Sequence, residues 1–538
     1  MNPYKPSAGK NPVTTPFFTA STVVGAGARE VMGHPAPDPV VLRGHGTDVQ
    51  SVSFAVVDGV PCVLSGYAPR SLRTHRPRLH PPPSAPIGAS RLPLTRHPFP
   101  TPRPDIPPRD GNGDVVAWDV RARRPLWRLP AHTPSSGALH AELAPGSSAR
   151  VLTQGRDGTL KCWRTSVGRG GDPRTPPRAP PSWTLSSGSY HYCKFATRES
   201  AGDDGTGALV AVAGETQSAL DVCEMPSLND EDDEDDEDDD DEEDADADTP
   251  RMGAPRRLAS LIAAADREHA SASSRVSPVE SPSNPSESRD RLGVVMAVAF
   301  LPPTRGGHNG RNGRRVAILA AHEEGTVCLW RLGNDDAFDE PDGRDDAEPD
   351  EPTWRSRVHR DAATCLAADA TGDGFVSGGA DGACVRFRVA WGDDDDDIPG
   401  GSKARVQKPT VDTLRSHGPF APRNPNVDAA GDVRALVGVA AVAVRDDAKI
   451  FAAGYWDGRV RLFEYGARSS GRTLASFGYH EHAATCVAFA PSRLRGREWA
   501  GHAGWLASGS RDGTVAMWAV YPPKEDGAKW GEGDGDDG

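Results

Sequence analysis

Residues Trp505–Trp518 read WLASGSRDGTVAMW, two runs of alternating apolar and polar residues joined at Arg511-Asp512-Gly513. Alternation predicts half-buried β-strands, and Asp-Gly between two such runs is a strong hairpin signal. Gly513 can adopt the positive φ that a tight turn between twisted strands needs, and Asp512 can accept backbone N–H hydrogen bonds across the turn. This stretch therefore predicts a β-hairpin.

The same hairpin pattern recurs along the chain. Clear copies are LTQGRDGTLKCW at 152–163, ILAAHEEGTVCLW at 318–330, FVSGGADGACVRF at 375–387 and IFAAGYWDGRVRLF at 450–463. A weak copy runs from Val210 to Met225, and Cys223 stands there in place of the aromatic residue. One further copy is split, with VLSG at 63–66 and GDVVAW at 113–118. With the opening stretch, these make seven copies.

A histidine, two strands, an Asp-Gly turn and a third strand ending in an aromatic residue is the WD-repeat pattern. Each repeat of about 40–45 residues forms a four-stranded blade that cannot bury both faces alone. Blades therefore pack around an axis, and the ring must close to protect its edges. Residues 39–43 (PVVLR) precede the first histidine and are expected to form the outer strand of the last blade. The predicted fold is all-β, a seven-bladed WD-repeat β-propeller.

Histidines and turn aspartates that recur once per blade favour a structural network over catalysis, in which the turn Asp bonds the histidine. The predicted structural positions are His45, Asp157, Trp163, Trp330, His359, Asp381, Asp457, His480, Asp512 and Trp518. No phosphate loop, nucleophile elbow or metal spacing is present, so we expect no catalytic residue, no cofactor and no bound metal. Glu324 occupies a turn-Asp position, so His322-Glu323-Glu324 is not interpreted as a metal motif.

Seven repeats explain about 300 residues of the 538, so insertions and tails must account for the rest. The predicted organisation is a disordered tail at 1–38, a propeller at 39–522 with disordered insertions at about 67–110, 226–291, 332–353 and 391–430, and a disordered tail at 523–538. The N-terminal composition also fits a transit peptide. The Pro- and Arg-rich insertion 67–110 is interpreted as a loop or a gene-model error, with a docking site for an aromatic-grooved domain as the alternative.

The acidity of the chain is local. The net charge is −15, and Asp230–Asp244 is an unbroken run of fifteen acidic residues, so the remainder is near neutral. Such a run must be solvated, and we interpret it as a spacer between the third and fourth blades or as a contact for basic partners. A short helix is predicted at Arg257–His269.

The eight cysteines all fall within predicted strands, and none forms C-x-x-C. They are interpreted as small core residues in a reducing compartment. No stretch reaches the ~20 apolar residues that a membrane span needs, and the N-terminus lacks a hydrophobic signal core.

Two features go beyond the repeat. Trp456, next to Tyr455, lies in a tight turn near one face of the ring, and Arg156 and Arg511 hold the same turn position in other blades. Because exposed Trp, Tyr and Arg are frequent hot-spot residues, these four are the candidate protein-binding residues. The second feature is Trp118–Arg121 (WDVR), which resembles a short motif of cullin-ligase substrate receptors.

Several segments together resemble one family. They are VLRG at 41–44, LTQGRD at 152–157, CEMP at 223–226, HEEG at 322–325, GYWDGRVRLF at 454–463, HAATCVAFA at 482–490 and the terminus LASGSRDGTVAMWAVYP at 506–522. The chain is similar here to the family of guanine nucleotide-binding protein subunit β-like protein 1 and ASTRA-associated protein 1. The split first blade and the acidic insertion depart from that family.

The resemblance implies a non-enzymatic scaffold of the ASTRA assembly and the Tel2–Tti1–Tti2 co-chaperone. It implies a link to chromatin remodelling and to phosphatidylinositol-3-kinase-like kinases as clients, with residence in nucleus and cytoplasm. We expect protein partners, no direct nucleic-acid or membrane contact, and a monomeric propeller. The alternatives are a cullin-ligase substrate receptor and a G-protein β-like signalling adaptor. Prolines at positions 3, 6, 12 and 16 disfavour the N-terminal helix of a G-protein β subunit.

Overall fold

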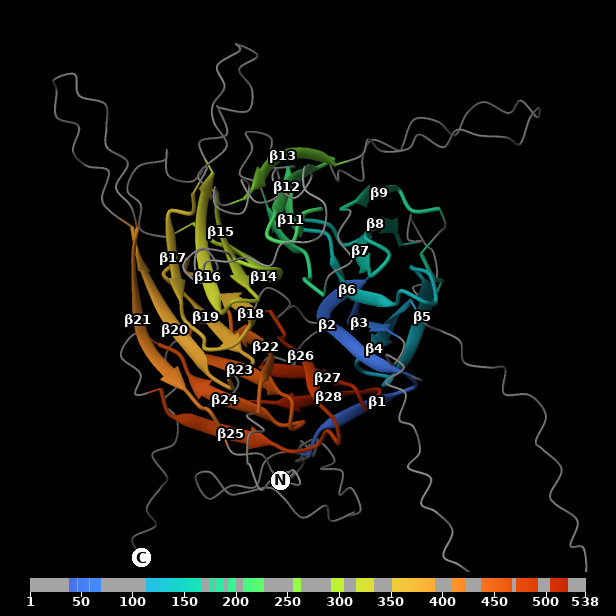
Figure 1. Cartoon of the computed structure of the whole chain (residues 1–538). Helices are drawn as coiled ribbons and strands as arrows, with labels where there is room; N and C mark the ends of the chain where they lie inside the picture. The colour runs from blue at the N-terminus through green and yellow to red at the C-terminus, as the bar shows by residue number, and fades with distance from the viewer. Residues whose placement is uncertain are drawn as a thin grey trace, which may run out of the picture.

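The computed structural model consists of β-strands arranged around a centre (Figure 1). The structure describes residues 38–45, 47–57, 59–68, 113–165, 175–177, 180–187, 192–199, 207–226, 255–262, 292–303, 316–332, 351–391, 409–420, 437–466, 471–491 and 504–520. Within these residues no helix is assigned, and hence none that could cross a membrane.

Seven four-stranded antiparallel sheets make up the ring, and each is one blade. Blade 1 contains β2 (Asp48–Val57), β3 (Val60–Ala68), β4 (Asp114–Asp119) and β5 (Arg124–Pro130). Blade 2 contains β6 (Ala138–Leu143), β7 (Arg150–Gly155), β8 (Thr159–Arg164) and β9 (Trp183–Ser186). Blade 3 contains β10 (Ala196–Glu199), β11 (Ala208–Ala213), β12 (Leu220–Met225) and β13 (Arg256–Leu261).

The remaining blades follow the same order. Blade 4 contains β14 (Val295–Leu301), β15 (Val316–His322), β16 (Thr326–Leu332) and β17 (Trp354–Arg357). Blade 5 contains β18 (Ala363–Ala368), β19 (Gly374–Gly379), β20 (Cys384–Ala390) and β21 (Thr410–His417). Blade 6 contains β22 (Val439–Val444), β23 (Ile450–Tyr455), β24 (Val460–Glu464) and β25 (Thr473–Phe477). Blade 7 contains β26 (Ala484–Phe489), β27 (Trp505–Ser510), β28 (Thr514–Ala519) and β1 (Val40–Arg43).

Blade 7 joins the two ends of the propeller. The first strand of the chain, β1, pairs antiparallel with the last, β28, from Val40 opposite Met517 to Arg43 opposite Thr514. Figure 1 shows the blue β1 beside the red β28. The predicted outer strand at 39–43 and the predicted count of seven blades are therefore confirmed, and the ring is closed.

The split repeat also folds as predicted. Strands β3 and β4 are neighbours in blade 1, with Val63 opposite Trp118 and Gly66 opposite Val115. Tyr67 and Ala68, placed in the predicted insertion, still belong to β3. The predicted tails and most of the predicted insertions, including the acidic run 230–244, lie outside the described residues.

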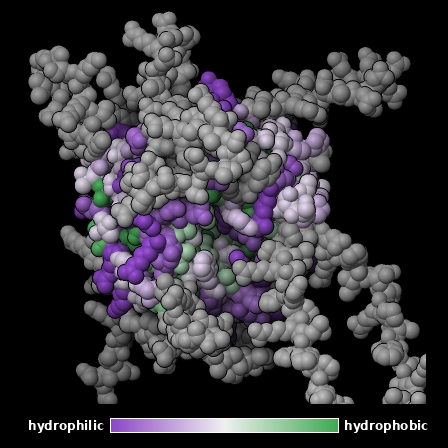
Figure 2. Space-filling model, in the orientation of Figure 1, coloured by the Kyte–Doolittle hydropathy of each residue, from purple (hydrophilic) through white to green (hydrophobic). Residues whose placement is uncertain are grey.

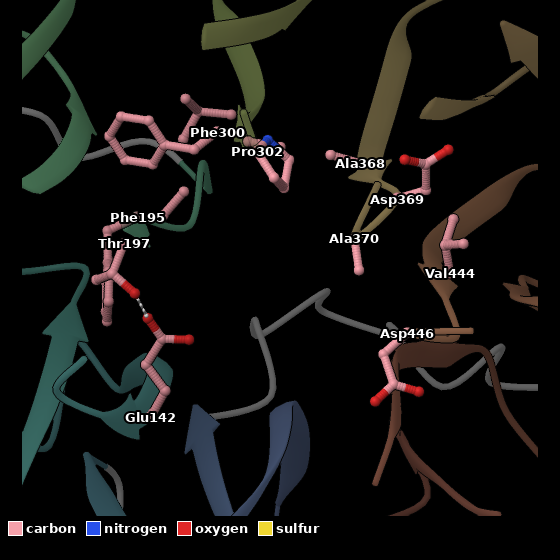
Figure 3. Close-up of a pocket in the computed structure, with 13 residues that line it drawn as sticks. Glu142, Phe195, Thr197, Phe300, Pro302, Ala368, Asp369, Ala370, Val444 and Asp446 are labelled. Atoms are coloured by element: carbon pink, nitrogen blue, oxygen red, sulfur yellow. Dashed lines mark hydrogen bonds between the residues drawn. The ribbon is translucent and has the colours of Figure 1, made fainter. Parts of the chain in front are cut away.

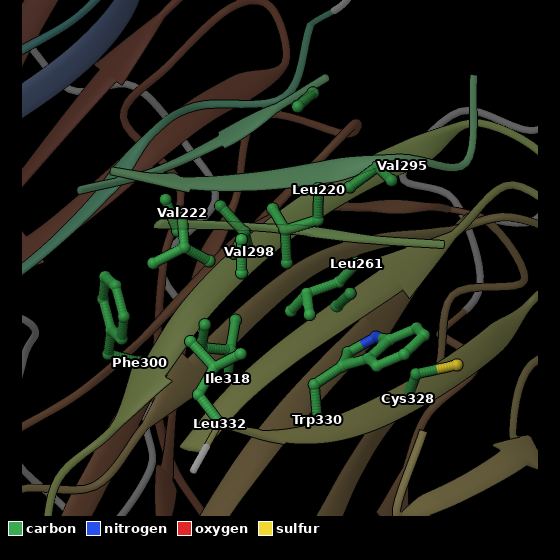
Figure 4. Close-up of a cluster of buried hydrophobic side chains, with 14 of the residues drawn as sticks. Leu220, Val222, Leu261, Val295, Val298, Phe300, Ile318, Cys328, Trp330 and Leu332 are labelled. Carbon is green, nitrogen blue, oxygen red and sulfur yellow. The ribbon is translucent and has the colours of Figure 1, made fainter. Parts of the chain in front are cut away.

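The core lies between the blades. Among the described residues, seven clusters of buried apolar side chains each fill the space between two neighbouring blades. Figure 4 shows the cluster between blades 3 and 4, where Val222 and Leu261 face Ile318 and Trp330. Full burial of one such side chain contributes about 1.5–3 kcal/mol.

The middle strands differ from the half-buried strands that alternation predicts. In β27, every residue from Leu506 to Ser510 is buried, because a neighbouring blade covers each face of the sheet. Exposure alternates instead in outer strands such as β17. In the middle strands of a propeller, polar and apolar residues can therefore alternate along the sequence while all of them are buried.

Two outer strands lie inside predicted insertions. Strand β13 lies in 226–291, and β21 lies in 391–430. The acidic run thus falls within blade 3 and not between blades 3 and 4. The predicted helix at Arg257–His269 is wrong for its first residues, because pairing with β12 satisfies their backbone groups in a strand.

All eight cysteines are buried and free. Seven lie in strands, whereas Cys193 lies in the loop before β10, so its predicted strand position is wrong. Burial raises the pKa of the Cys193 thiol to about 12, which keeps it protonated at neutral pH.

Candidate protein-interaction face

The recurring histidines and turn aspartates form the network that the repeat predicts in three blades. In blade 2, Trp163 Nε1 donates to Thr153 Oγ1 at 2.8 Å, and Thr153 Oγ1 lies 3.0 Å from His132 Nε2. His132 Nδ1 lies 3.0 Å from the Asp157 carboxylate. The matching distances are 3.1 Å for His359 and Asp381 in blade 5 and for His480 and Asp512 in blade 7.

The turn carboxylates in this network are fully engaged. Burial alone would raise the pKa of Asp157, but hydrogen bonds from His132 and Thr159 hold it below its ordinary value. Asp512 has a lowered pKa for the same reason, through His480 and Thr514. These side chains stabilise the turns.

Blade 6 departs from the network, and the predicted histidine partner of Asp457 is wrong. The Asp457 carboxylate accepts hydrogen bonds from Arg461 Nη2 at 2.7 Å and Nη1 at 3.2 Å. The Arg461 guanidinium packs against two aromatic rings that contact each other, 4.2 Å from the centre of Tyr455 and 4.6 Å from that of Phe420. In blade 6, Arg461 therefore bonds the turn Asp as the histidine does in blades 2, 5 and 7.

The described residues of blade 1 form part of the network, and its turn lies outside them. Trp118 Nε1 donates to Ser65 Oγ at 2.9 Å, and Ser65 Oγ lies 3.1 Å from His45 Nε2. The other ring nitrogen of His45 is buried and has no hydrogen-bond partner among the described residues. Burial and the charge of Arg128 lower the pKa of His45 to about 3, so the ring is neutral.

His322 and Glu324 do not form a metal site. His322 lies at the end of β15 and its Nδ1 lies 3.4 Å from the Gly293 carbonyl oxygen. Across the described ranges, no three His, Cys, Asp or Glu side chains come together as metal ligands would.

In blades 2, 4, 5, 6 and 7 the turns between the second and third strands lie at one end of the ring, here called the turn face. Their positions match, because the same backbone N–H donates to the chain just ahead of the blade's first strand. These hydrogen bonds run from Arg156 to Gly137, from Glu323 to Val294, from Ala380 to Ala362, from Trp456 to Gly438 and from Arg511 to Ala483, at 2.8–3.3 Å. Trp456, Arg156 and Arg511 therefore share this face, as predicted.

Trp456 is the exposed aromatic residue of its turn. Its side chain is 48% exposed, and its ring lies on the backbone of Gly438, where a Cβ atom would come within 2.6 Å of it. Gly438 therefore makes room for the ring. The Arg461–Asp457 ion pair fixes the next residue of the same turn, so Trp456 is held in place with one side of its ring free.

Tyr455 is not part of the face. Its side chain is fully buried, and its hydroxyl lies 3.5 Å from Cys384 Sγ. Tyr455 ends β23, and successive strand residues point to opposite sides, so its neighbour Trp456 faces solvent while Tyr455 faces the core. Its prediction as a contact residue is wrong.

Sequence reasoning missed Tyr192, which precedes β10 and is 60% exposed. The Arg156 guanidinium lies 4.4 Å from the centre of the Tyr192 ring. The two residues form a second aromatic and cationic contact point on the turn face. The His-Tyr-Cys context of Tyr192 carries no repeat signal, so the sequence alone could not place it.

At the opposite end of the ring, a cavity of about 370 Å³ opens among the ends of strands from blades 2 to 6. Figure 3 shows Phe195, Phe300 and Glu142 on one side of the cavity and Asp369 and Asp446 on the other. Thr197 donates to Glu142 at 2.7 Å, and Tyr465 donates to Asp369 at 2.7 Å. These carboxylates are engaged within the protein.

The WDVR segment lies at the turn between β4 and β5, which is the end of the blade opposite the turn face. Trp118 is buried, and Asp119 accepts hydrogen bonds from the backbone N–H groups of Arg121 and Ala122 at 2.8 Å. Arg121 is exposed. Trp and Asp therefore have structural roles, and Arg121 alone is presented to solvent.

Comparison with known proteins gives a consistent picture. The family model "WD domain, G-beta repeat" matches residues 471–519, which cover β25 to β28. ASTRA-associated protein 1 of Aspergillus flavus is 25% identical over 272 residues, 44% of this chain and 53% of that protein. Its homologue in Verticillium alfalfae is 22% identical over 455 residues, 77% of this chain and 86% of that protein.

Two further likenesses are narrower. Mouse guanine nucleotide-binding protein subunit beta-like protein 1 is 35% identical over 85 residues, 16% of this chain and 22% of that protein. The β-propeller domain of Myceliophteria thermophila Cps50 (Swd1) superposes with a TM-score of 0.48 and 11% identity, over 90% of this chain and 99% of that domain. The chain thus spans about half of the Aspergillus flavus relative and about a fifth of the mouse one.

The repeat match, these relatives and the closed ring of seven blades agree. The chain is a seven-bladed WD-repeat β-propeller, and it is similar in sequence to ASTRA-associated protein 1 and to guanine nucleotide-binding protein subunit beta-like protein 1.

Proposed function

We propose that the chain is a non-enzymatic scaffold subunit of an ASTRA-like assembly. In this role it joins Tel2–Tti1–Tti2 and contributes to chromatin remodelling and to maturation of phosphatidylinositol-3-kinase-like kinases, in the nucleus and the cytoplasm. The propeller acts as a monomer and contacts proteins rather than nucleic acid or membrane.

One observation carries the proposal: Trp456 is exposed on a turn that internal contacts hold in place. A fixed aromatic side chain binds with little loss of conformational entropy, and such residues dominate interface energetics. The relatives named ASTRA-associated protein 1 supply the class of assembly.

Affinity purification of the tagged full-length chain from its own cells tests the proposal. We expect Tel2-class subunits and kinases to co-purify, and Trp456→Ala to remove most of them. Leu414→Ser is the matched control, since Leu414 is 42% exposed but lies on the outer strand β21. Absence of Tel2-class proteins from the wild-type eluate would overturn the proposal.

A cullin-ligase substrate receptor is the second candidate, because Arg121 is exposed on a turn that Asp119 fixes. This function predicts that Arg121→Ala abolishes co-precipitation with the ligase adaptor. Adaptor binding that is unchanged in the variant, or absent from the wild type, rejects it.

A further inference from the structure

The turn aspartates of blades 2, 5, 6 and 7 are engaged in hydrogen bonds or ion pairs inside the protein. Asp157 bonds His132 and Thr159, and Asp512 bonds His480 and Thr514. Asp381 bonds His359 and two backbone N–H groups, and Asp457 bonds Arg461. None of these negative charges is available to neutralise a cation at the surface.

Three arginines at the same turns have no such partner among the described residues. They are Arg156 in blade 2, Arg459 in blade 6 and Arg511 in blade 7. No ion pair joins any of the three to a carboxylate within the described part of the chain. The Nε atoms of Arg156 and Arg459 are buried without a hydrogen-bond acceptor, and Arg511 is exposed. Guanidinium groups bind carboxylates strongly, so three unpaired ones form an incomplete site.

These arginines belong to blades 6, 7 and 2. Blades 6, 7, 1 and 2 follow one another, joined by shared apolar clusters, and the turn of blade 1 lies outside the described residues. Trp456 stands beside Arg459 in blade 6, and Tyr192 lies under Arg156 at the other end. We call the turn-face surface formed by Tyr192, Arg156, Arg511, Trp456 and Arg459 the cationic arc.

The cationic arc is bounded by acidic residues. In blade 4, Glu323 and Glu324 hold the turn positions and are exposed. Glu481 is exposed beside Arg511, so the arc is positive overall but not uniformly so. Figure 2 shows one side of the molecule, where hydrophilic residues lie around small separate patches of hydrophobic ones.

We propose that the cationic arc binds an acidic segment of a partner protein that carries apolar side chains between its carboxylates. Carboxylates would pair with Arg156, Arg459 and Arg511, and an apolar side chain would pack on the free side of Trp456. This inference rests on the proposed scaffold function and names the chemistry of the partner at that face.

A short peptide suits the arc better than a nucleic acid. A nucleic acid presents a charge at every phosphate and needs an extended basic surface, whereas Glu323, Glu324 and Glu481 interrupt this face. The chain as a whole carries a net charge of −15, which opposes nonspecific binding of any polyanion. Binding of an acidic peptide must therefore come from a local site.

Fluorescence anisotropy on the purified full-length chain tests the inference without any assembly partner. The probes are a fluorescein-labelled polyglutamate peptide and a peptide of alternating glutamate and leucine, each of about 12 residues and hence long enough to span about 40 Å. We expect both to bind at low salt, the alternating peptide more tightly. Arg156→Glu combined with Arg511→Glu should weaken both by about tenfold or more.

Matched variants separate the contributions. Trp456→Ala should remove the advantage of the alternating peptide while leaving polyglutamate binding unchanged. Arg124→Glu is the control, because Arg124 is exposed at the turn between β4 and β5 at the opposite end of the ring. Thermal melting of each variant confirms that it folds.

Three outcomes would overturn the inference: no binding of either peptide by the folded wild type, equal weakening by Arg124→Glu, or tighter binding of an oligothymidylate of the same length. The last outcome would make the arc a nucleic-acid site. If the wild-type chain binds the peptides but does not co-purify Tel2-class proteins, the proposed assembly is overturned and the inference about the cationic arc stands.

Discussion

Arg461 and Asp457 form an ion pair in blade 6 at the place of the histidine–aspartate contact of other blades. In blade 6 the Arg461–Asp457 pair is buried, with side chains 5% and 6% exposed. Burying two charges is unfavourable unless they are paired and further bonded, and here the rings of Tyr455 and Phe420 cover the guanidinium. The pair fixes the turn from which Trp456 projects.

A double-mutant cycle measures this pair. Arg461→Met leaves a buried carboxylate without its partner, so we expect the free energy of unfolding to fall by about 3–5 kcal/mol. Adding Asp457→Asn should restore much of the loss, because the buried charge is then gone. Chemical denaturation gives both values. Asp457→Asn alone completes the cycle, and a loss in the double variant equal to the sum of the two single losses would show that the pair has no coupling.

Neutral buried histidines predict a pH dependence. The pKa of His45 is about 3 in the folded chain, because burial disfavours the imidazolium and Arg128 repels it. In the unfolded chain the pKa is about 6.5, so the unfolded state binds more protons below that pH. Stability from His45 is therefore complete above pH 6.5 and declines as the pH falls towards 3.

The expected decline is about 2 kcal/mol between pH 6.5 and pH 5. His45→Gln should be less stable than the wild type at pH 7 but show a correspondingly shallower pH dependence. His482 is exposed, so His482→Gln is the matched control and should keep the wild-type slope. Denaturation curves between pH 6.5 and pH 5 measure the free energy of unfolding at each pH. The same pH dependence for the wild type and His45→Gln would contradict the lowered pKa of His45.

Among the elements, the outer strands are the ones that sequence reasoning placed least well. The hairpins of the middle strands and the closing strand β1 were predicted, because Asp-Gly turns and dense apolar residues mark them. Strands β13 and β21 were missed, since an outer strand is exposed on one face and needs only backbone pairing to form. Most residues of β21, Leu414 among them, are exposed, and its sequence shows no regular alternation of apolar and polar residues.

The residues of the candidate site likewise fall into those that the repeat pattern could place and those that it could not. Trp456, Arg156 and Arg511 could be placed because each occupies the repeat's turn position. Tyr192 could not be placed, because it lies in a connection outside the repeat. The burial of Tyr455 could not be predicted either, because it depends on contacts with Cys384 of β20 and Arg461 of β24.

Closure of the ring by β1 is expected to contribute to the free energy of unfolding. Leu42 is fully buried in the cluster between blades 7 and 1, so Leu42→Ala should lower the free energy of unfolding by about 2–5 kcal/mol. Arg43→Ala is the control in the same strand, because Arg43 is exposed and, among the described residues, donates to the Tyr479 hydroxyl at 3.0 Å. We expect it to cost less than about 1 kcal/mol. Chemical denaturation of both variants tests this, and equal effects would contradict closure by apolar burial.

At the scale of the whole molecule, a closed ring with its core between blades is suited to hold contact residues in fixed positions. The seven interblade clusters leave the turns free to vary without disturbing the core. The two ends of the ring differ, with unpaired arginines and Trp456 at one and engaged carboxylates around a cavity at the other. Each end can therefore meet a different partner.

A cryo-electron microscopy map of the chain within its purified assembly tests this account most directly. The account predicts seven blades with β1 closing the last one, and density of another subunit against Trp456 and the neighbouring arginines. A map with an open ring, or with the turn face bare and the partner held only at the opposite end, would contradict it.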